Sequence, residues 1–256
     1  MTHAQLRIAA IGDLHIRTTV PSSLVRQAMD LHKRADVLII AGDITNGGRI
    51  LEVEVAADFL RRIDLPKLCV LGNHDRRTTR RRHFIALLRE AGVQVLDGES
   101  TTLAGFPDVG FAGVGGSGGG FWPEEAEHTP SNRAIQAMAV RARREAARLD
   151  VALSSIDAPV KVAILHFAPT ITTLIGEPPV KYPLLGNSAL GRVVDKHCVD
   201  LVFHGHSHIG SPEGLTPGGV PVRNVAHSIH NGFSMHTLSV SARTRSAPAQ
   251  VPGWSR

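Results

Sequence analysis

Short apolar runs alternate along the chain with longer segments in which apolar residues recur at helical spacing. The apolar runs are short and rich in β-branched side chains, which is typical of strands covered on both faces. They are residues 6–11, 37–40, 68–71, 160–165 and 201–203. The helical patterns cover residues 22–34, 51–63, 80–91, 132–153 and 188–196. This alternation predicts an α/β fold, with a central sheet and helices outside it.

The pattern changes in the last third of the chain. Between Gly214 and Leu238, Gly, Pro and Asn interrupt short apolar pieces such as residues 220–222 and 233–238, which predicts antiparallel hairpins. Residues 242–256 are rich in Arg, Ser and Pro and predict a flexible tail. We therefore expect a single domain over residues 1–241, because a chain of 256 residues is short for two α/β domains.

Composition excludes a membrane-spanning protein and indicates an ordinary globular one. Hydrophobic residues make up 43% of the chain, but no apolar run reaches the roughly 18 residues that a membrane span needs. The N-terminal residues have no basic region followed by a long apolar stretch, so we expect no signal peptide and a cytoplasmic location. Cys69 and Cys198 both sit in apolar segments and predict buried free thiols. The sequence does not specify an oligomeric state.

The net charge of +5 suits an anionic substrate and is compatible with nucleic acid without requiring it. Two groups of arginines stand out. The first is either a solvated helix start or a rim that attracts phosphates, and it comprises Arg76, Arg77, Arg80, Arg81 and Arg82. The second is expected on an exposed helix face and comprises Arg141, Arg143, Arg144 and Arg148. Neither group has the interleaved aromatic residues of single-strand nucleic-acid grooves.

Polar side chains with metal-binding chemistry follow each of the five predicted strands directly. They are Asp13 and His15, then Asp43, then Asn73, His74 and Asp75, then His166, and finally His204, His206 and His208. In an open α/β sheet, side chains at the carboxyl ends of strands converge on one crevice. The sequence therefore predicts one cluster of Asp, His and Asn side chains.

Such a cluster needs a bound cation, because carboxylates and imidazoles packed together otherwise repel or compete for protons. Carboxylate oxygen with imidazole nitrogen suits Mn, Fe, Zn, Co or Ni. Asp13 and His15 are close enough in sequence to reach one ion, and Asp43 carries two oxygens that could bridge two. In two-metal sites, ions roughly 3.5–4 Å apart hold both the attacking and the leaving oxygen of an in-line displacement.

The ordered blocks Asp-x-His, Gly-Asp, Gly-Asn-His-Asp, His and Gly-His-x-His resemble those of the calcineurin-like metallophosphoesterase superfamily, in particular its small single-domain bacterial members. The resemblance covers Asp13 to His208. It implies a four-layer α/β/β/α sandwich with mixed sheets in place of a single doubly wound sheet. It also implies hydrolysis of phosphoric esters with two divalent or trivalent transition metal ions, of which Mn, Fe and Zn are the first candidates.

The same resemblance implies a role for each matching residue. The first metal would be held by Asp13, His15, Asp43 and His208, and the second by Asp43, Asn73, His166 and His206. Asn73 and His74 would contact substrate, and His74 would protonate the leaving oxygen or bind the phosphoryl group. Asp75 would hold the His74 ring in its tautomer.

Other polar features leave alternatives open. His204 is expected to support the site or the fold, whereas His227 and His230 fit a loop role as well as a site role. The glycine-rich stretch 113–120 lacks the Lys-Ser/Thr of a phosphate-binding loop, so we interpret it as a flexible loop bordering the site. Phe121 and Trp122, which follow it, are candidate apolar contacts for a substrate.

These observations favour a phosphodiesterase acting on a cyclic nucleotide or another small diester, ahead of a phosphomonoesterase. A nuclease acting on DNA or RNA is the alternative, motivated by the arginines after Asp75. A non-catalytic metal-binding scaffold is the least supported hypothesis, because no residue of the ligand set is missing. We expect a small phosphate ester as the partner, with nucleic acid not required and no membrane.

Overall fold

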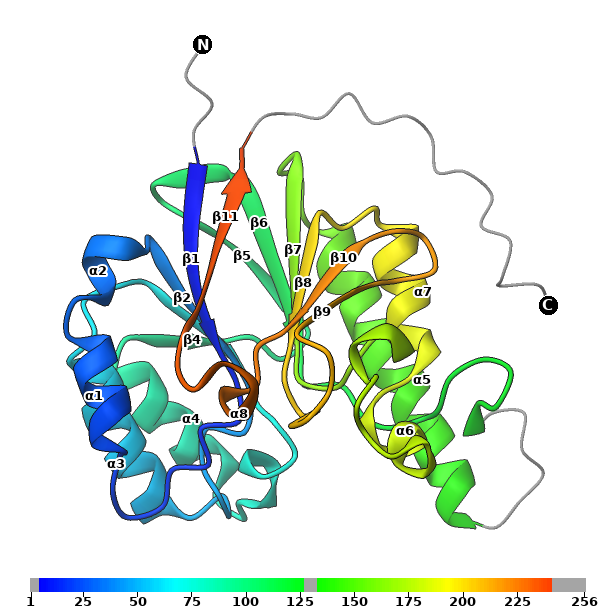
Figure 1. Ribbon diagram of the computed structural model, residues 1–256, viewed down its shortest axis with the longest axis horizontal. Coiled ribbons are helices and arrows are strands. Elements are labelled where there is room, and N and C mark those ends of the chain that lie inside the picture. Colours follow the sequence, from blue (N-terminus) through cyan, green and yellow to red (C-terminus); the bar gives the residue numbers. More distant parts are fainter. Residues whose placement is uncertain (1–4, 127–132, 241–256) are drawn as a thin grey trace.

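In a computed structural model of the protein, residues 5–126 and 133–240 are described, and two β-sheets pack face to face between outer layers of helices (Figure 1). The first sheet contains β1 (Gln5–Ile11), β2 (Val37–Ala41), β3 (Lys67–Val70), β4 (Val93–Val95) and β11 (Ser234–Ser239). The second contains β5 (Glu99–Leu103), β6 (Phe106–Val114), β7 (Val160–Leu165), β8 (Leu201–His204), β9 (Glu213–Leu215) and β10 (Pro221–Asn224).

Both sheets are mixed. The first has the order β11-β1-β2-β3-β4, in which only β11 runs antiparallel to its neighbour. The second has the order β5-β6-β7-β8-β10-β9, with antiparallel strands at its two edges and parallel strands between them. The parallel strands of each sheet therefore present their carboxyl ends together.

Helices cover the outer face of each sheet. The first sheet is covered by α1 (Ser22–Ala28), α2 (Leu31–Arg34), α3 (Ile50–Arg61) and α4 (Arg81–Glu90). The second is covered by α5 (Arg133–Ser154) and α7 (Ser188–Lys196). The remaining short elements lie in loops and are η1 (Asp75–Arg77), η3 (Ile171–Thr173), η4 (Pro179–Lys181), α6 (Tyr182–Leu185) and α8 (His227–His230). None of the helices in the described residues has the length and apolar character of a membrane span.

The alternation of side chains along each strand produces the layers. In β1, Leu6, Ile8 and Ala10 point into the core between the sheets, whereas Ala9 and Ile11 pack under the helices of the first outer layer. Because both faces of the central strands are largely buried, their sequences are mostly apolar, and that of β2 is apolar throughout. The four-layer sandwich with mixed sheets that the resemblance implied is confirmed.

All five predicted strands are present, but others were not predicted. Strands β4 and β5 are short and partly exposed, and the first residues of β6 include Pro107 and Asp108, so none of them carries a clear apolar signal. The helix expected over residues 22–34 is divided at Met29 and Asp30 into α1 and α2. The predicted tail 242–256 lies outside the described residues.

In the described part of the last third of the chain, one hairpin is present where several were expected. Strands β9 and β10 pair antiparallel as predicted, but β10 also joins the parallel strand β8. Strand β11 leaves the second sheet altogether and pairs antiparallel with β1 in the first sheet.

The glycine-rich stretch is packed against its neighbours, which corrects the expectation of a flexible loop. The Gly115 carbonyl accepts hydrogen bonds from the backbone N–H groups of His166 and Phe167, at 3.0 Å each. The Gly116 N–H donates to the buried carboxylate of Glu145 at 3.0 Å. The stretch therefore helps to fix the loop that carries His166.

Removing side-chain volume between the two sheets tests the sandwich core. Ile39 in β2 is fully buried there, and Ile39→Ala is expected to lower the free energy of unfolding by about 2–5 kcal/mol. The control is Val151→Ala on the exposed surface of α5, which should change it by less than about 0.5 kcal/mol. Equal effects of the two substitutions in denaturant unfolding would contradict this packing.

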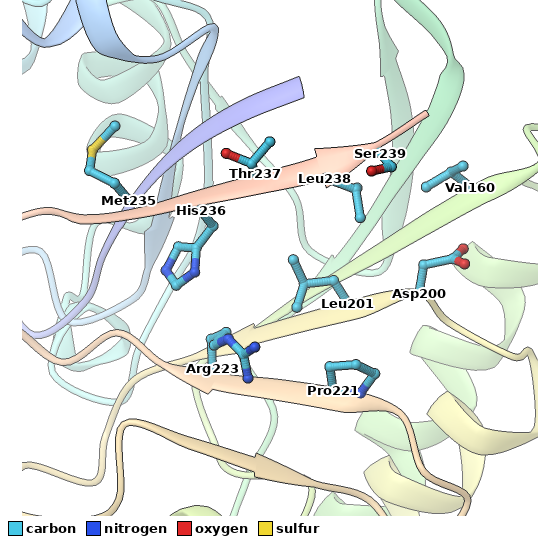
Figure 2. Close-up of a pocket in the computed structure, with 10 residues that line it drawn as sticks. All are labelled: Val160, Asp200, Leu201, Pro221, Arg223, Met235, His236, Thr237, Leu238 and Ser239. Atoms are coloured by element: carbon cyan, nitrogen blue, oxygen red, sulfur yellow. The ribbon is translucent and has the colours of Figure 1, made fainter. Parts of the chain in front are cut away.

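A cavity of about 460 Å³ lies between β11 and the strands β8 and β10 (Figure 2). His236 and Arg223 lie on facing strands in its wall. The His236 ring packs against Phe203 with centroids 5.0 Å apart, and its Nε2 atom lies 3.0 Å from the Ser234 hydroxyl. Burial, followed by the positive charges of Arg223 and His230, lowers the pKa of His236 to about 4.

His236 should therefore make the fold sensitive to acid. Since its pKa is lower in the folded than in the unfolded chain, the unfolded chain binds more protons, and stability falls as the pH drops from about 6.5 toward 4. The free energy of unfolding should decrease between pH 7 and pH 5, and in His236→Gln this decrease should be smaller by about 1 kcal/mol. Partial exposure of the ring keeps the effect this small. Urea unfolding of both proteins at the two pH values measures it, and equal losses would refute the role of this ring.

Candidate metal centre

The predicted ligands lie on loops that follow β1, β2 and β3 in the first sheet and β7 and β8 in the second. Among the described residues, their donor atoms form three groups within which all atoms lie within 4.8 Å of one another. The groups are Asp13, His15 and His208; His15, Asp43 and His74; and Asp43, His166 and His206. Side chains far apart in the sequence are therefore brought to one place.

Asp43 lies at the centre of the cluster. Its Oδ1 atom accepts a hydrogen bond from the backbone N–H of His74 at 2.8 Å. Its Oδ2 atom lies 3.4 Å from His166 Nε2 and 3.8 Å from His15 Nε2. One carboxylate thus faces imidazoles carried by both sheets.

Asp13 connects the first loop with the Gly-His-x-His loop. Its Oδ1 atom lies 3.0 Å from His208 Nε2, and its Oδ2 atom accepts the backbone N–H of His206 at 2.8 Å. The Nε2 atoms of His15 and His208 are 3.4 Å apart. This part of the cluster is open to solvent, because the His208 side chain is 45% exposed whereas that of Asp13 is 1% exposed.

His166 is held in one orientation by the backbone. Its Nδ1 atom lies 2.8 Å from the Ala41 carbonyl, which can only accept, so Nδ1 carries a proton. Its Nε2 atom faces the Asn73 amide oxygen at 3.0 Å as well as Asp43. A histidine fixed through one nitrogen to a carbonyl is the usual arrangement of a metal ligand.

The cluster concentrates charge in a buried place. Burial alone would raise the pKa of Asp43, but His166 and the hydrogen bonds to the carboxylate lower it below its ordinary value. Burial works against a charged His166 ring, yet the charge of Asp43 raises the pKa of His166 to about 9. The Nδ1 atom of His15 is buried without a partner. A cluster in which carboxylate oxygens and imidazole nitrogens lie this close together fits transition metal cations.

The backbone at the cluster is strained. Six non-glycine residues of the described chain have a positive φ, and four of them are predicted ligands: Asp13 (57°), His15 (43°), Asp43 (50°) and His206 (68°). Such conformations are disfavoured for residues with a Cβ atom and persist where the surroundings impose them.

Two glycines allow the loops to approach closely. A Cβ atom on Gly72 would lie 2.1 Å from Asp43 Oδ1, and one on Gly205 would lie 2.4 Å from Asp13 Oδ2. Any larger residue would push the carboxylates out of the cluster. Steric exclusion therefore explains why glycine occupies these positions in the Gly-Asn-His-Asp and Gly-His-x-His blocks.

His74 stands at the open edge of the cluster. Its Nδ1 atom lies 2.5 Å from the Asn46 carbonyl and so donates to it. Its Nε2 atom lies 4.0 Å from Asp43 Oδ2 and 3.3 Å from a guanidinium nitrogen of Arg77. The contact with Asn46 was not predicted from the sequence, because every residue has a backbone carbonyl whatever its side chain.

Asp75 does not take the place beside the His74 ring that we expected. Its buried carboxylate accepts hydrogen bonds from the Thr45 N–H (2.8 Å) and hydroxyl (2.7 Å), and from the N–H groups of Ile44 and Gly72 (3.1 Å each). Burial, followed by the nearby charge of Asp43, raises the pKa of Asp75 to about 6. Asp75 thus ties the loop after β3 to the loop after β2.

The remaining histidines have separate surroundings. His204 is fully buried, with its ring nitrogens 2.7 Å from the Gly205 carbonyl and 2.8 Å from the Thr173 hydroxyl, as expected of a supporting residue. His227 donates its backbone N–H to Gly12 at the end of β1, which brings α8 beside the cluster. His230 Nε2 bonds the Asn224 carbonyl at 2.8 Å.

The first arginine group is divided between two roles. Arg76 pairs with Glu145 at 3.1 Å, and Arg81 pairs with Asp97 at 2.5 Å, so both are held in ion pairs of the fold. Arg148 of the second group joins Asp97 at 2.9 Å and is not on a purely exposed face. Arg77 alone in the first group contacts a residue of the cluster, within the ranges that the structure describes.

A model of the calcineurin-like phosphoesterase family matches residues 6–210 of the chain. Among curated proteins, none matches the sequence.

Several solved structures share the fold. The phosphopantetheinyl hydrolase PptH from Mycobacterium tuberculosis has a TM-score of 0.60 and 19% identity, covering 88% of this chain and 90% of its own. TT1561 from Thermus thermophilus has a TM-score of 0.53 and 16% identity, covering 93% and 100%. GAP50, the anchor in the inner membrane complex of Plasmodium, has a TM-score of 0.52 and 15% identity, covering 92% and 81%. At these identities the likeness shows the fold alone.

The contacts of Asp75 predict a structural effect of its removal. Asp75→Ala would leave three buried N–H groups without an acceptor and is expected to lower the free energy of unfolding of the metal-free protein by about 3 kcal/mol or more. His74→Ala, at the adjacent and partly exposed position, should cost less than about 1 kcal/mol. Denaturant unfolding with a chelator present makes the comparison. If both variants are equally stable, Asp75 does not hold the two loops together.

Proposed function

The chain belongs to the calcineurin-like phosphoesterase family and is a metal-dependent phosphoester hydrolase, and on this premise we propose that it is a phosphodiesterase acting on small diesters. The observation that supports the proposal most is the convergence of Asp43 with His15, His74 and His166. A cyclic nucleotide or another small diester is the proposed substrate, ahead of a phosphomonoester.

We assign one metal to Asp13, His15, Asp43 and His208 and a second to Asp43, Asn73, His166 and His206. The donor groups support this assignment, because Asp13, His15 and His208 form one group, Asp43, His166 and His206 form another, and Asp43 also lies in a group with His15. When bound, the cations would supply charge stabilisation for the phosphoryl group and a water of lowered pKa. Mn, Fe and Zn remain the first candidates, because oxygen and imidazole donors accept each of them.

His74 would act on the substrate through Nε2, since Nδ1 is engaged with the Asn46 carbonyl. A protonated ring could donate from Nε2 to the leaving oxygen or to a phosphoryl oxygen. Arg77, whose guanidinium lies 3.3 Å from that nitrogen, would bind the same phosphoryl group. Asp75 would act through the loop, as a positioning residue.

The charge near the centre supports our proposal that diesters are preferred. A monoester dianion carries one more negative charge than a diester and is usually met by several cationic side chains. Within residues 5–126 and 133–240, Arg77 is the one arginine that contacts the cluster. The nuclease alternative loses part of its support, because Arg76 and Arg81 are engaged in ion pairs within the fold. A cytoplasmic location stays a prediction from the sequence.

Hydrolysis assays test these roles. Protein loaded with Mn²⁺ should cleave bis-p-nitrophenyl phosphate, and His74→Ala should lower kcat by about 100-fold or more while keeping roughly two metal ions per chain by mass spectrometry. If His74 donates a proton to the leaving oxygen, the loss should be larger with diphenyl phosphate, whose leaving group is poorer. Asp43→Asn should lose metal as well as activity.

Full activity of His74→Ala would exclude the role given to this ring. Faster cleavage of DNA or RNA than of small diesters at low salt would favour the nuclease instead.

A further inference from the structure

Exposed apolar side chains gather on two segments that border the metal centre. Of the twelve large apolar side chains that are exposed in the described residues, six lie between residues 171 and 215. They are Ile171, Ile175, Val180, Leu184, Ile209 and Leu215. Single exposed apolar residues are normal on a protein surface, but a group beside a binding site indicates a ligand.

Two of these residues are connected to the loop that carries the predicted ligands His206 and His208. Ile209 follows His208 directly, and the Leu184 carbonyl lies 3.3 Å from His206 Nε2. Their side chains are nevertheless 61% and 60% exposed. The segment from η3 to α6 lies at the same end of the molecule as the loops after β7 and β8 (Figure 1).

A buried carboxylate fixes the two segments to each other. Glu177 accepts hydrogen bonds from the Ile209 N–H at 3.1 Å and from the Ser207 hydroxyl at 3.3 Å. The backbone at Gly176 approaches so closely that a Cβ atom there would lie 2.4 Å from the Ile209 carbonyl oxygen. The Ile175 side chain, which is 66% exposed, directly precedes Gly176 and so belongs to the short segment that Glu177 fixes to Ile209.

We propose that Ile175, Leu184 and Ile209 form an apolar wall that binds a hydrocarbon group of the substrate, so that the enzyme prefers phosphodiesters with an alkyl or aryl substituent. This inference rests on the phosphodiesterase function proposed above. A phosphoryl group bound at the metal centre would lie beside the loop that carries His206 and His208, so one of its ester substituents could reach Leu184 and Ile209. The continuity of the wall with the ligand loop favours a substrate over a membrane or a second protein.

A pair of esters that differ only in chain length tests the wall. Methyl p-nitrophenyl phosphate and hexyl p-nitrophenyl phosphate share a leaving group, and each buried methylene is worth roughly fourfold in binding. With Mn²⁺ and below micellar concentrations, kcat/KM of the unaltered protein should be about tenfold or more higher for the hexyl ester, mainly through KM.

Substitutions in the wall should abolish this preference. In Ile175→Ser combined with Ile209→Ser, the ratio of the two kcat/KM values should fall close to one. Ile175→Ser alone, which is further from His208, should lower the ratio by several-fold. The control is Val151→Ser on α5, which is 68% exposed and should keep the ratio of the unaltered protein. Metal content and thermal unfolding check that each variant is folded and loaded.

Equal kcat/KM values for the two esters, or an unchanged ratio in the double variant with its metals bound, would overturn the apolar wall and leave the phosphodiesterase standing. No hydrolysis of either ester by the metal-loaded protein would overturn the proposed function and the wall with it.

Discussion

The close approach of the Asp43 carboxylate to imidazoles from both sheets is the contact on which the rest of the structure depends. Burying a carboxylate is costly unless hydrogen bonds and opposite charges surround it. Here the backbone of His74 donates to Asp43, and His166 faces it from the second sheet. The sandwich therefore does more than bury apolar surface, because it aligns two sets of strand ends so that their loops share one charged position.

The loops around this position are built to resist relaxation. Asp13, His15, Asp43 and His206 all have positive φ angles, which free loops would avoid. Asp75 and His204 are both buried and hydrogen bond to the backbone of these loops, at Thr45 and Gly205 respectively. Donor atoms fixed in this way lose little freedom when a cation binds, which is the condition for tight and geometrically defined binding.

Sequence reasoning located the elements whose signal is carried by residue type. Strands such as β2 are uninterrupted apolar runs, and the ligands stand out because they follow such strands in the order of the family's motif blocks. It failed where the structure uses the backbone. Asp75 was expected to orient His74, but amide groups of Ile44, Thr45 and Gly72 bind its carboxylate, and the Asn46 carbonyl orients the ring instead. Strand β5 was missed because its exposed, polar residues resemble a loop.

The pairing of β1 with β11 has a consequence for how the protein is made. Gln5 lies opposite Ser239, so most of the described chain separates the two partners and they leave the ribosome at different times. Until the later strand arrives, one edge of β1 has no neighbour, and the nascent chain carries an open template for mispairing. The loop that holds Asp13 leaves from that same strand. The Gly-His-x-His loop also comes late, after β8 of the second sheet, so a nascent chain that ends before His208 lacks part of the ligand set.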